Sequence, residues 1–246
     1  MRELDPKSPP DLPACAVVGA GRLGTVLARA LDVAPPLRRG EPIPPAAQAV
    51  LLCVPDGKIA DAAAVVPPGP LVGHCSGATG LEALGDREGF SLHPLMSVPN
   101  GSDPSVLRGA GAAIDGTSPR ALDTAHALAN HLGMRAARVE PQDRVAYHAA
   151  GAMAANFLVA LEAAAEQLAA TAGVTREQLA PLVLATAHQW AEMGPEAALT
   201  GPIVRGDEAT VARHREAVAQ RTPELLELWD ALADATRALA GRKAPT

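Results

Sequence analysis

Three glycines near the start of the sequence have the spacing of a phosphate-binding turn. They lie in the segment Gly19-Ala20-Gly21-Arg22-Leu23-Gly24, directly after the apolar residues 14–18 and at the beginning of a helical pattern. In such a turn the first glycine permits a tight bend, the second lets backbone approach a pyrophosphate, and the third lets helix and strand pack closely. The N–H groups of the helix N-terminus then face the phosphates. The segment therefore predicts dinucleotide binding, and the alternative is a glycine-rich turn in a domain that has lost its cofactor.

Two arginines occupy the window in which the ribose is usually recognised. That window lies roughly twenty residues after the first glycine, and here it holds Arg38 and Arg39. A carboxylate there would accept a hydrogen bond from the ribose 2′-hydroxyl of NAD, whereas a guanidinium suits the 2′-phosphate of NADP. We therefore expect NADP (NADPH). The alternative is a solvated charged turn, because Pro35 and Pro36 make the second strand short or irregular.

Two further strands end in residues that could form the floor of a nicotinamide pocket. Val54-Pro55 closes the strand expected at residues 49–54, and Ser76-Gly77 follows the strand expected at residues 71–75. In open α/β sheets, ligands bind at the carboxyl ends of the strands. We therefore expect both pairs to contact the cofactor. Lys58 could also approach it, although a lysine at the start of a helix is more often a surface residue.

Two histidines are candidates for the proton donor of a hydride transfer. His93 lies in Ser91-Leu92-His93-Pro94-Leu95, after another expected strand, and could donate a proton or serve as a structural hydrogen-bonding group. His148, Ala152 and Asn156 are spaced i, i+4, i+8 along an Ala-rich helix, which predicts one shared face. Because histidine titrates near neutrality, His148 could protonate the reduced oxygen or nitrogen, with Asn156 orienting the substrate. The alternative is a histidine and an asparagine that tie helices together.

A Gly/Pro-rich segment between two expected helices offers a candidate carboxylate-binding residue. It reads Leu199-Thr200-Gly201-Pro202-Ile203-Val204-Arg205-Gly206-Asp207. Arg205 could bind a substrate carboxylate through two parallel hydrogen bonds, with Asp207 orienting the guanidinium. Alternatively, Asp207 caps the following helix and Arg205 is simply exposed.

The residues before 140 alternate short apolar strands with helices. The expected strands are residues 14–18, 49–54, 71–75, 89–92, 109–115 and 135–139, and the expected helices are residues 22–31, 59–65 and 120–132. This alternation predicts an α/β fold with a mostly parallel sheet covered on both faces. Continuous apolar runs are typical of strands buried on both sides. We expect a Rossmann-like NAD(P)-binding domain over residues 14–139.

From residue 140 onward the strand-like runs stop, and Ala, Leu, Glu and Gln dominate. The expected helices are residues 141–172, 176–193, 208–220 and 223–239. Thr175 and Thr222 stand where N-caps belong, and Pro223 stands at a first helical position. The pattern predicts an all-α domain over residues 140–246.

Composition and charge argue against several classes of function. A net charge of −6 argues against a nucleic-acid-binding surface, and 2% aromatic residues leave few side chains for base stacking. Cys15, Cys53 and Cys75 lie in or beside apolar runs without a CxxC pair, which indicates free thiols in a reducing compartment rather than a metal site. The sequence shows no apolar run long enough to span a bilayer and no signal-peptide hydrophobic region in residues 1–13. We expect a cytoplasmic protein without nucleic-acid or membrane partners.

Taken together, these segments resemble one family. The chain resembles the Rossmann-like oxidoreductases that carry a C-terminal helical domain of unknown function (domain of unknown function 2520), within the 6-phosphogluconate dehydrogenase-like superfamily. The resemblance runs from residue 14 to residue 240. It rests on the glycine turn, Val54-Pro55-Asp56, His74-Cys75-Ser76-Gly77, Ser91-Leu92-His93-Pro94-Leu95, Tyr147-His148-Ala149 with Asn156, and residues 199–207.

By architecture, this family is similar to ketopantoate reductase and pyrroline-5-carboxylate reductase. Both pass hydride from NADPH to a C=O or C=N bond beside a carboxylate. In ketopantoate reductase the first long helix after the Rossmann domain carries a lysine and asparagines at helical spacing, and His148 and Asn156 look like the matching positions. Here a histidine replaces the lysine, and Ala152 stands where a second polar residue is expected.

The resemblance implies an NADPH-dependent oxidoreductase that transfers hydride to a small carboxylate-bearing ketone or imine. It makes His148 or His93 the proton donor, Asn156 the residue that orients the substrate, and Arg205 the residue that binds its carboxylate. The helical domain would complete the substrate site and form a homodimer, as in the relatives. Two other classes stay open: a non-catalytic NADP(H)-binding sensor, and a helical interaction protein with a vestigial Rossmann half.

Overall fold

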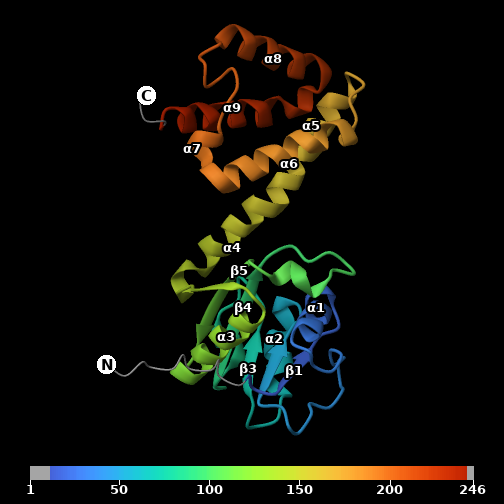
Figure 1. Cartoon of the computed structure of the whole chain (residues 1–246), viewed down its shortest axis with the longest axis vertical. Helices are drawn as coiled ribbons and strands as arrows, with labels where there is room; N and C mark the ends of the chain where they lie inside the picture. The colour runs from blue at the N-terminus through green and yellow to red at the C-terminus, as the bar shows by residue number, and fades with distance from the viewer. Residues whose placement is uncertain (1–11, 243–246) are drawn as a thin grey trace, which may run out of the picture. The chain divides into compact units, whose positions relative to one another are not determined.

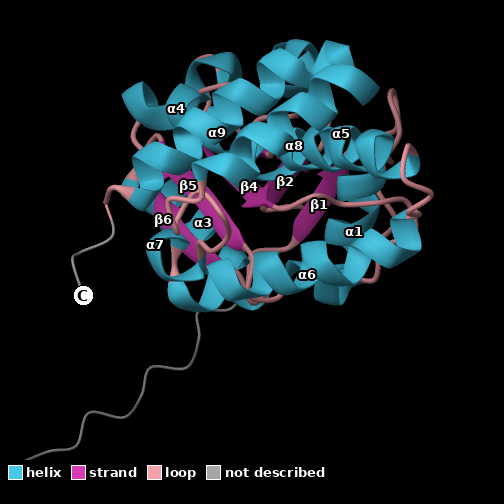
Figure 2. Cartoon of the chain, turned by 90° about the horizontal axis from the view of Figure 1, so that it is seen from above, coloured by secondary structure: helices cyan, strands magenta, loops and turns pink. Residues whose placement is uncertain are grey.

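The computed structural model describes residues 12–242, which form two compact units. The first ends at Ala155 and the second begins at Asn156. Figure 1 follows the chain from β1 in blue to α9 in red, and Figure 2 shows helices and strands in different colours. Every strand of the described residues belongs to the first unit. Residues 140–155 therefore belong to the same compact unit as the sheet. The expected boundary between a cofactor-binding domain and a substrate domain after residue 139 stays a prediction.

The first unit is built on a six-stranded sheet whose strands are ordered as in the sequence. The first four strands are parallel, β5 is antiparallel to β4, and β6 is parallel to β5. The mostly parallel sheet expected from the sequence is confirmed, and all six expected strands are present. They are β1 (Cys15–Val18), β2 (Ala49–Leu52), β3 (Leu71–His74), β4 (Gly89–Leu95), β5 (Gly111–Gly116) and β6 (Arg135–Arg138).

Helices cover both faces of this sheet. Helices α1 (Arg22–Ala30) and α3 (Pro119–His131) pack on one face, in a core that includes Leu51 and Phe90. Helix α2 (Ile59–Ala64) packs on the other face, against Val50 and its neighbours. Successive β2 residues thus enter opposite cores, which explains why the run Ala-Val-Leu-Leu is apolar without alternation. Short 3₁₀ turns complete the unit: η1 (Asp56–Lys58), η2 (Leu81–Leu84) and η3 (Pro104–Leu107).

The strand expected after α1 is reduced to a single residue. Leu37 makes an isolated parallel bridge with Val18, and its backbone bonds the Val17 carbonyl and the Gly19 amide at 2.8 Å each. Pro35 and Pro36 precede it, and proline cannot donate to a strand ladder. The short second strand expected from these prolines is confirmed. Its one paired residue, Leu37, holds the chain beside β1 immediately before Arg38 and Arg39.

The long helix expected at residues 141–172 is present but changes its winding. It starts as a 3₁₀ turn, η4 (Pro141–Asp143), continues as α4 (Arg144–Ala152), becomes π-helical in η5 (Met153–Phe157), and ends as α5 (Leu158–Ala170). A π-helix closes i→i+5 hydrogen bonds, so residue spacing along a face differs from that of an α-helix. The i, i+4, i+8 relation expected for His148, Ala152 and Asn156 therefore holds only to Ala152.

By length and composition, this helix could also span a membrane. Among the described residues, Pro141–Ala170 is the one helix that meets those criteria, with a mean hydropathy of 1.2 in its most apolar window and no buried residue there. No continuous apolar run was expected there because Glu, Gln, Asn and Gly interrupt the Ala-rich sequence, whereas the average hydropathy over many residues is still apolar. One helix of this kind is weak evidence for membrane insertion, since apolar helices that pack in soluble assemblies have the same composition.

The second unit contains only helices in its described part. They are α5, α6 (Arg176–Met193), α7 (Pro195–Ala198), α8 (Glu208–Arg221), a 3₁₀ turn η6 (Pro223–Leu225) and α9 (Leu226–Ala240). Thr175 and Gln178 form the capping box of α6, in which the Thr175 N–H donates to Gln178 Oε1 at 2.9 Å. Thr222 does not cap with its side chain; its hydroxyl donates to the Val218 carbonyl at 3.5 Å instead.

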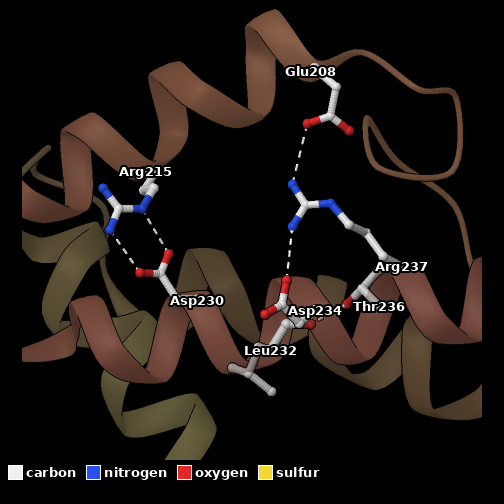
Figure 3. Close-up of polar contacts among 7 residues, drawn as sticks. All are labelled: Glu208, Arg215, Asp230, Leu232, Asp234, Thr236 and Arg237. Carbon is white, nitrogen blue, oxygen red and sulfur yellow. Dashed lines mark hydrogen bonds and ion pairs between the residues drawn. The ribbon is translucent and has the colours of Figure 1, made fainter.

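Helices α8 and α9 are joined by ion pairs on their exposed sides (Figure 3). Arg215 donates two hydrogen bonds to the carboxylate of Asp230, each 2.8 Å long. Arg237 bonds Glu208 on the other helix at 3.2 Å and Asp234 on its own helix at 3.1 Å. These pairs fix how α8 and α9 lie along each other, although exposed ion pairs contribute little to stability.

Candidate functional site

The glycine turn has the backbone that a phosphate-binding turn requires. Gly19 has φ +107°, and a Cβ there would lie 2.2 Å from the Cys53 carbonyl oxygen. A Cβ on Gly24 would lie 1.9 Å from the Gly19 carbonyl oxygen, so helix and strand touch at this point. A Cβ on Gly21 would meet no atom within 4 Å, so the backbone there is open to a ligand. Each glycine thus has the geometry expected of its position.

Helix α1 begins at the open side of this turn. Its N-cap is Gly21, which has no side chain to bond the N–H groups of the first turn, and that turn holds no acidic residue. The first two helical residues are Arg22 and Leu23. An uncapped helix N-terminus presents N–H donors and partial positive charge to an anion.

A pocket of about 1040 Å³ opens beside the glycine turn and gathers residues that the sequence analysis singled out. Val54 and Pro55 follow β2, and Lys58 lies in η1; all three line this pocket. Lys58 is paired with Asp61 at 3.2 Å, so its ammonium already has a partner. From the glycine turn come Gly19 and Ala20, and from the segment after Leu37 come Arg38 and Arg39.

The two arginines reach the pocket because of the single bridging residue Leu37. Glu41 also lines the pocket, but its carboxylate accepts a hydrogen bond from the backbone N–H of Arg38, 2.6 Å away. The acid is therefore used to hold the turn. Arg38 and Arg39 therefore stand at the position where an NAD-specific domain has a carboxylate.

Two groups at the end of β3 are committed to the fold. The His74 ring is fully buried, with Nδ1 accepting from the Ser76 N–H and Nε2 lying 3.2 Å from the Gly80 carbonyl oxygen. Burial, helped by the positive charge of Arg144, lowers the pKa of His74 to about 4. Ser76 Oγ accepts from the N–H groups of Ala78 and Thr79 at 3.2 and 2.9 Å. Ser76 thus shapes the turn in front of the sheet.

Arg144 connects helix α4 to β4 and to the turn after β3. Its guanidinium is buried and donates to Ser91 Oγ at 3.0 Å and to the Ser76 carbonyl at 2.8 Å. Among the described residues, its Nε finds no hydrogen-bond partner. Because Arg144 is the first residue of α4, these bonds hold the beginning of the helix against the turn that follows β3 and against the middle of β4.

His93, Tyr147 and His148 meet above Gly77. His93 Nδ1 lies 2.8 Å from the Tyr147 hydroxyl. The His93 and His148 rings are edge-to-face, with centroids 6.1 Å apart. A Cβ on Gly77 would lie 2.9 Å from His93 Nε2 and 2.7 Å from His148 Cδ2. The structure therefore brings together His93, His148 and Gly77, three of the residues expected in the site.

The two histidines of this cluster differ in environment. His93 is partly buried, and its pKa is lowered to about 4, first by burial and then by the positive charges of His148 and Arg144. His148 is exposed. A ring with so low a pKa is neutral at physiological pH, so His93 can donate a hydrogen bond but does not carry an ionised proton to give away.

Sequence reasoning missed two members of the cluster, Arg144 and Tyr147. Arg144 lies three and four residues before Tyr147 and His148, which puts all three on one side of a helix. Ser91 and His93 are two apart on β4 and therefore point to the same side of the sheet. These two spacings were the available signal, but only the folded chain pairs the helix face with the strand face.

The remaining candidates belong to the second unit. Asn156 lies in the π-helical stretch and is exposed. Asp207 is the N-cap of α8, where its side chain accepts from the Thr210 N–H at 3.1 Å. Hydrogen bonds from the hydroxyl and the N–H of Thr210, together with the positive charges of Arg213 and Arg205, lower the pKa of Asp207. Asp207 thus acts as a helix cap, Arg205 is exposed, and the substrate roles of Asn156 and Arg205 stay predictions.

Comparison with known families identifies most of the C-terminal part of the chain. The model of a family described as a domain of unknown function (DUF2520) matches residues 111–236, which is more than half of the sequence. The match begins at β5 and ends within α9, and so includes Arg144, Tyr147 and His148 but not the glycine turn. No curated protein matches the chain.

Solved structures share the fold over nearly the whole chain. A protein of Thermotoga maritima is 22% identical, with a TM-score of 0.79 over 94% of this chain and 100% of that one. A provisionally assigned NADP oxidoreductase of Bacteroides fragilis is 19% identical, with a TM-score of 0.75 over 92% and 98%. The pyrroline carboxylate reductase of Plasmodium falciparum, solved with NADP bound, is 10% identical, with a TM-score of 0.60 over 93% and 98%. The fold is therefore a Rossmann-type α/β domain followed by a helical domain.

Proposed function

The chain belongs to the family described as a domain of unknown function (DUF2520), and on that premise we propose that it is an NADPH-dependent oxidoreductase. Its substrate would be a small ketone or imine that carries a carboxylate. Two of the three structural relatives above are described as an NADP oxidoreductase and as a pyrroline carboxylate reductase with NADP bound, which supports the reaction class.

The observation that carries the proposal is the pocket shared by the glycine turn and two arginines. Gly19, Arg38 and Arg39 line one cavity of about 1040 Å³, next to the open backbone of Gly21. A dinucleotide needs its pyrophosphate at the turn and its adenosine ribose near the end of the next strand. Because the arginines stand at that second position, a 2′-phosphate fits there better than a free hydroxyl.

When bound, NADPH would supply the hydride. The N–H groups at the start of α1, those of Arg22, Leu23 and Gly24, would bind the pyrophosphate, and Arg38 with Arg39 would bind the 2′-phosphate. Val54, Pro55, Ser76 and Gly77 would lie along the nicotinamide half, since they follow the strands at their carboxyl ends.

On the substrate side, His148 would deliver the proton to the reduced heteroatom. It is exposed and stands at the strand ends beside His93. Asn156 would orient the substrate and Arg205 would bind its carboxylate. Holding donor and acceptor in reactive geometry, with water excluded, would provide most of the rate enhancement.

The enzyme would act as a cytoplasmic homodimer. Helices α5 and α6 bury none of their residues, and Val159, Leu182 and Leu184 are 70%, 66% and 70% exposed. Apolar side chains this exposed along two long helices indicate a surface that another chain covers. All three cysteines are free, as suits a reducing compartment.

Cofactor titrations test the central claim. Calorimetry with NADPH and with NADH should show tighter binding of NADPH, and replacing Arg38 and Arg39 together by alanine should weaken NADPH at least tenfold more than NADH. The matched control is Arg120→Ala with Arg135→Ala, which removes the same charge from exposed positions on α3 and β6. Equal weakening of both cofactors would refute the 2′-phosphate assignment, and no binding of either would refute the proposed function.

A further inference from the structure

The His93 ring has one nitrogen occupied and one nitrogen open. Nδ1 lies 2.8 Å from the Tyr147 hydroxyl. The opposite edge, with Nε2, faces Gly77, which has no side chain, and a Cβ there would lie 2.9 Å from Nε2 and 2.7 Å from His148 Cδ2. Within residues 12–242, Tyr147 is the hydrogen-bond partner of this ring, and no protein group bonds Nε2. A ring with this arrangement presents Nε2 to whatever molecule approaches.

Tyr147 determines which nitrogen carries the hydrogen. The phenol has one hydrogen to donate, and its two possible acceptors are His93 Nδ1 at 2.8 Å and the His93 carbonyl oxygen at 3.5 Å. The shorter contact is well within hydrogen-bonding range, and the longer one is at its limit. Burial raises the pKa of Tyr147, so the phenol keeps its hydrogen. With Nδ1 accepting, the ring's own hydrogen must be on Nε2.

The groups that face His93 keep it neutral. Burial is the main cause of the low pKa of His93, followed by the charges of His148 and Arg144, both on helix α4. His74, on β3, acts in the same direction and is the smallest of these influences. Asp56, in η1, has the opposite influence and is outweighed. Because burial is the largest cause, the low pKa of His93 does not depend on a single charged side chain.

We infer that His93 is the hydrogen-bond donor to the substrate's reacting carbonyl oxygen or imine nitrogen, and that Tyr147 is the positioning residue that fixes His93 as the Nε2–H tautomer. This inference rests on the proposed function for the identity of the reaction. It assigns different tasks to the two histidines, since His93 polarises the bond to be reduced and His148 supplies the proton.

A neutral imidazole is well suited to this task. Addition of hydride to the carbon leaves the electron pair of the broken π bond on the heteroatom, where negative charge grows. A fixed N–H donor that already points at that atom stabilises this charge without reorganising. A neutral imidazole polarising a carbonyl is a known arrangement in enzymes. For Nε2 to carry the hydrogen, Nδ1 must accept a hydrogen bond, and the Tyr147 hydroxyl donates it.

Nitrogen NMR on histidine-labelled, cofactor-free protein tests the tautomer directly. The wild-type protein should show His93 as the Nε2–H tautomer at neutral pH, without an imidazolium signal at about pH 5. Tyr147→Phe keeps the ring but removes the hydroxyl, and should change His93 to the Nδ1–H form or a mixture. His93→Gln identifies the signals, and Thr124→Val, which removes an exposed hydroxyl of α3, should leave them unchanged.

Steady-state kinetics with a panel of 2-oxo acids and cyclic imines provide the second readout. Tyr147→Phe should lower kcat by roughly tenfold or more with little change in KM, because the donor is misdirected while binding is kept. A wild-type His93 that is Nδ1–H or charged at neutral pH overturns the inference, as does a Tyr147→Phe spectrum identical to that of the wild type or an unchanged kcat.

The two proposals fail in different experiments. The tautomer is read without cofactor or substrate, so it does not depend on NADPH binding. If NADPH does not bind, the proposed function is lost and the tautomer result stands. If NADPH binds and Tyr147→Phe changes neither spectrum nor kcat, only the role of Tyr147 and His93 is lost.

Discussion

The sheet unit buries its apolar residues within itself, whereas the helical unit leaves many of its own exposed. Strand β2 buries all four of its residues, and α3 buries Leu128 together with three alanines. Helices α5 and α6, which contain 13 and 18 residues, bury none. The first unit has its core on both faces of the sheet, and the second has apolar side chains exposed along α5 and α6.

The polar groups of the two units differ in the same way. Arg144 in the first unit is buried and binds an uncharged hydroxyl and a carbonyl. Arg215 in the second unit is half exposed and binds a carboxylate. A buried guanidinium is costly to disrupt, and an exposed ion pair is not. The sheet unit therefore buries both its apolar side chains and its arginine anchor within one chain, whereas the helical unit keeps both kinds of group at its surface.

Equivalent leucine substitutions in the two units provide the strongest contrast. Leu128→Ala, inside the first unit, should lower the free energy of unfolding by about 4 kcal/mol at any protein concentration, because it leaves a cavity in a packed core. Leu182→Ala, on exposed α6, should change the unfolding of dilute protein little and weaken self-association instead. Urea titrations and sedimentation at several concentrations measure both effects.

Sedimentation also decides what covers the helices. A wild-type protein that stays monomeric at all concentrations would contradict the homodimer. Recovery of folded protein only in detergent would instead favour a membrane for the Pro141–Ala170 helix.

Replacing Arg144 or Arg215 should lower the free energy of unfolding by less than Leu128→Ala does. Arg144→Met should lower the free energy of unfolding by about 3 kcal/mol, because it removes the hydrogen bonds that Arg144 donates to the Ser91 hydroxyl and the Ser76 carbonyl. Arg215→Met should cost less than about 1 kcal/mol. Both tryptophans, Trp190 and Trp229, lie in the second unit, so their fluorescence follows that unit alone while circular dichroism follows both. Equal losses for the two variants would refute the contrast.

The smallest expected effect is a pH dependence confined to the first unit. Folding lowers the pKa of buried His74 from 6.5 to about 4, so the unfolded chain binds more protons between these values. Stability should therefore rise with pH across that window and level off above it. The contribution of His74 between pH 5 and pH 7 is about 2 kcal/mol. Urea unfolding of His74→Asn at several pH values should show a smaller rise of the unfolding free energy between pH 5 and pH 7. A rise equal to that of the wild type would exclude His74 as the cause of this pH dependence.

The sheet and the glycine turn could be predicted because their signals are local. The glycine spacing, the preceding strand and the following helix lie within one short segment, and the apolar runs mark each strand directly. Arg38 and Arg39 were found by their distance from the glycines, and the structure places both in the pocket beside that turn. Local structure of this kind depends on neighbouring residues in the sequence, so it can be predicted before the fold is known.

The cluster around His93 could not be predicted because its contacts join distant segments. Tyr147 is 54 residues from His93, and Arg144 is 53 residues from Ser91 and 68 from Ser76. No local periodicity encodes which helix face meets which strand end. The π-helical stretch was missed for another reason: Met153 to Phe157 contains neither proline nor glycine that would signal a change of winding.

The reduced second strand also protects the sheet against aggregation. An open edge strand offers unpaired N–H and C=O groups on which another chain can add a strand. Here the edge beyond β1 is closed by Leu37 alone, between Pro35-Pro36 on one side and Pro42 on the other, and prolines cannot extend a ladder. The opposite edge, β6, exposes Arg135, whose charge disfavours the addition of a second copy, while Arg138 is paired with Asp115 and Glu140. Copies of this chain are therefore discouraged from joining sheet to sheet.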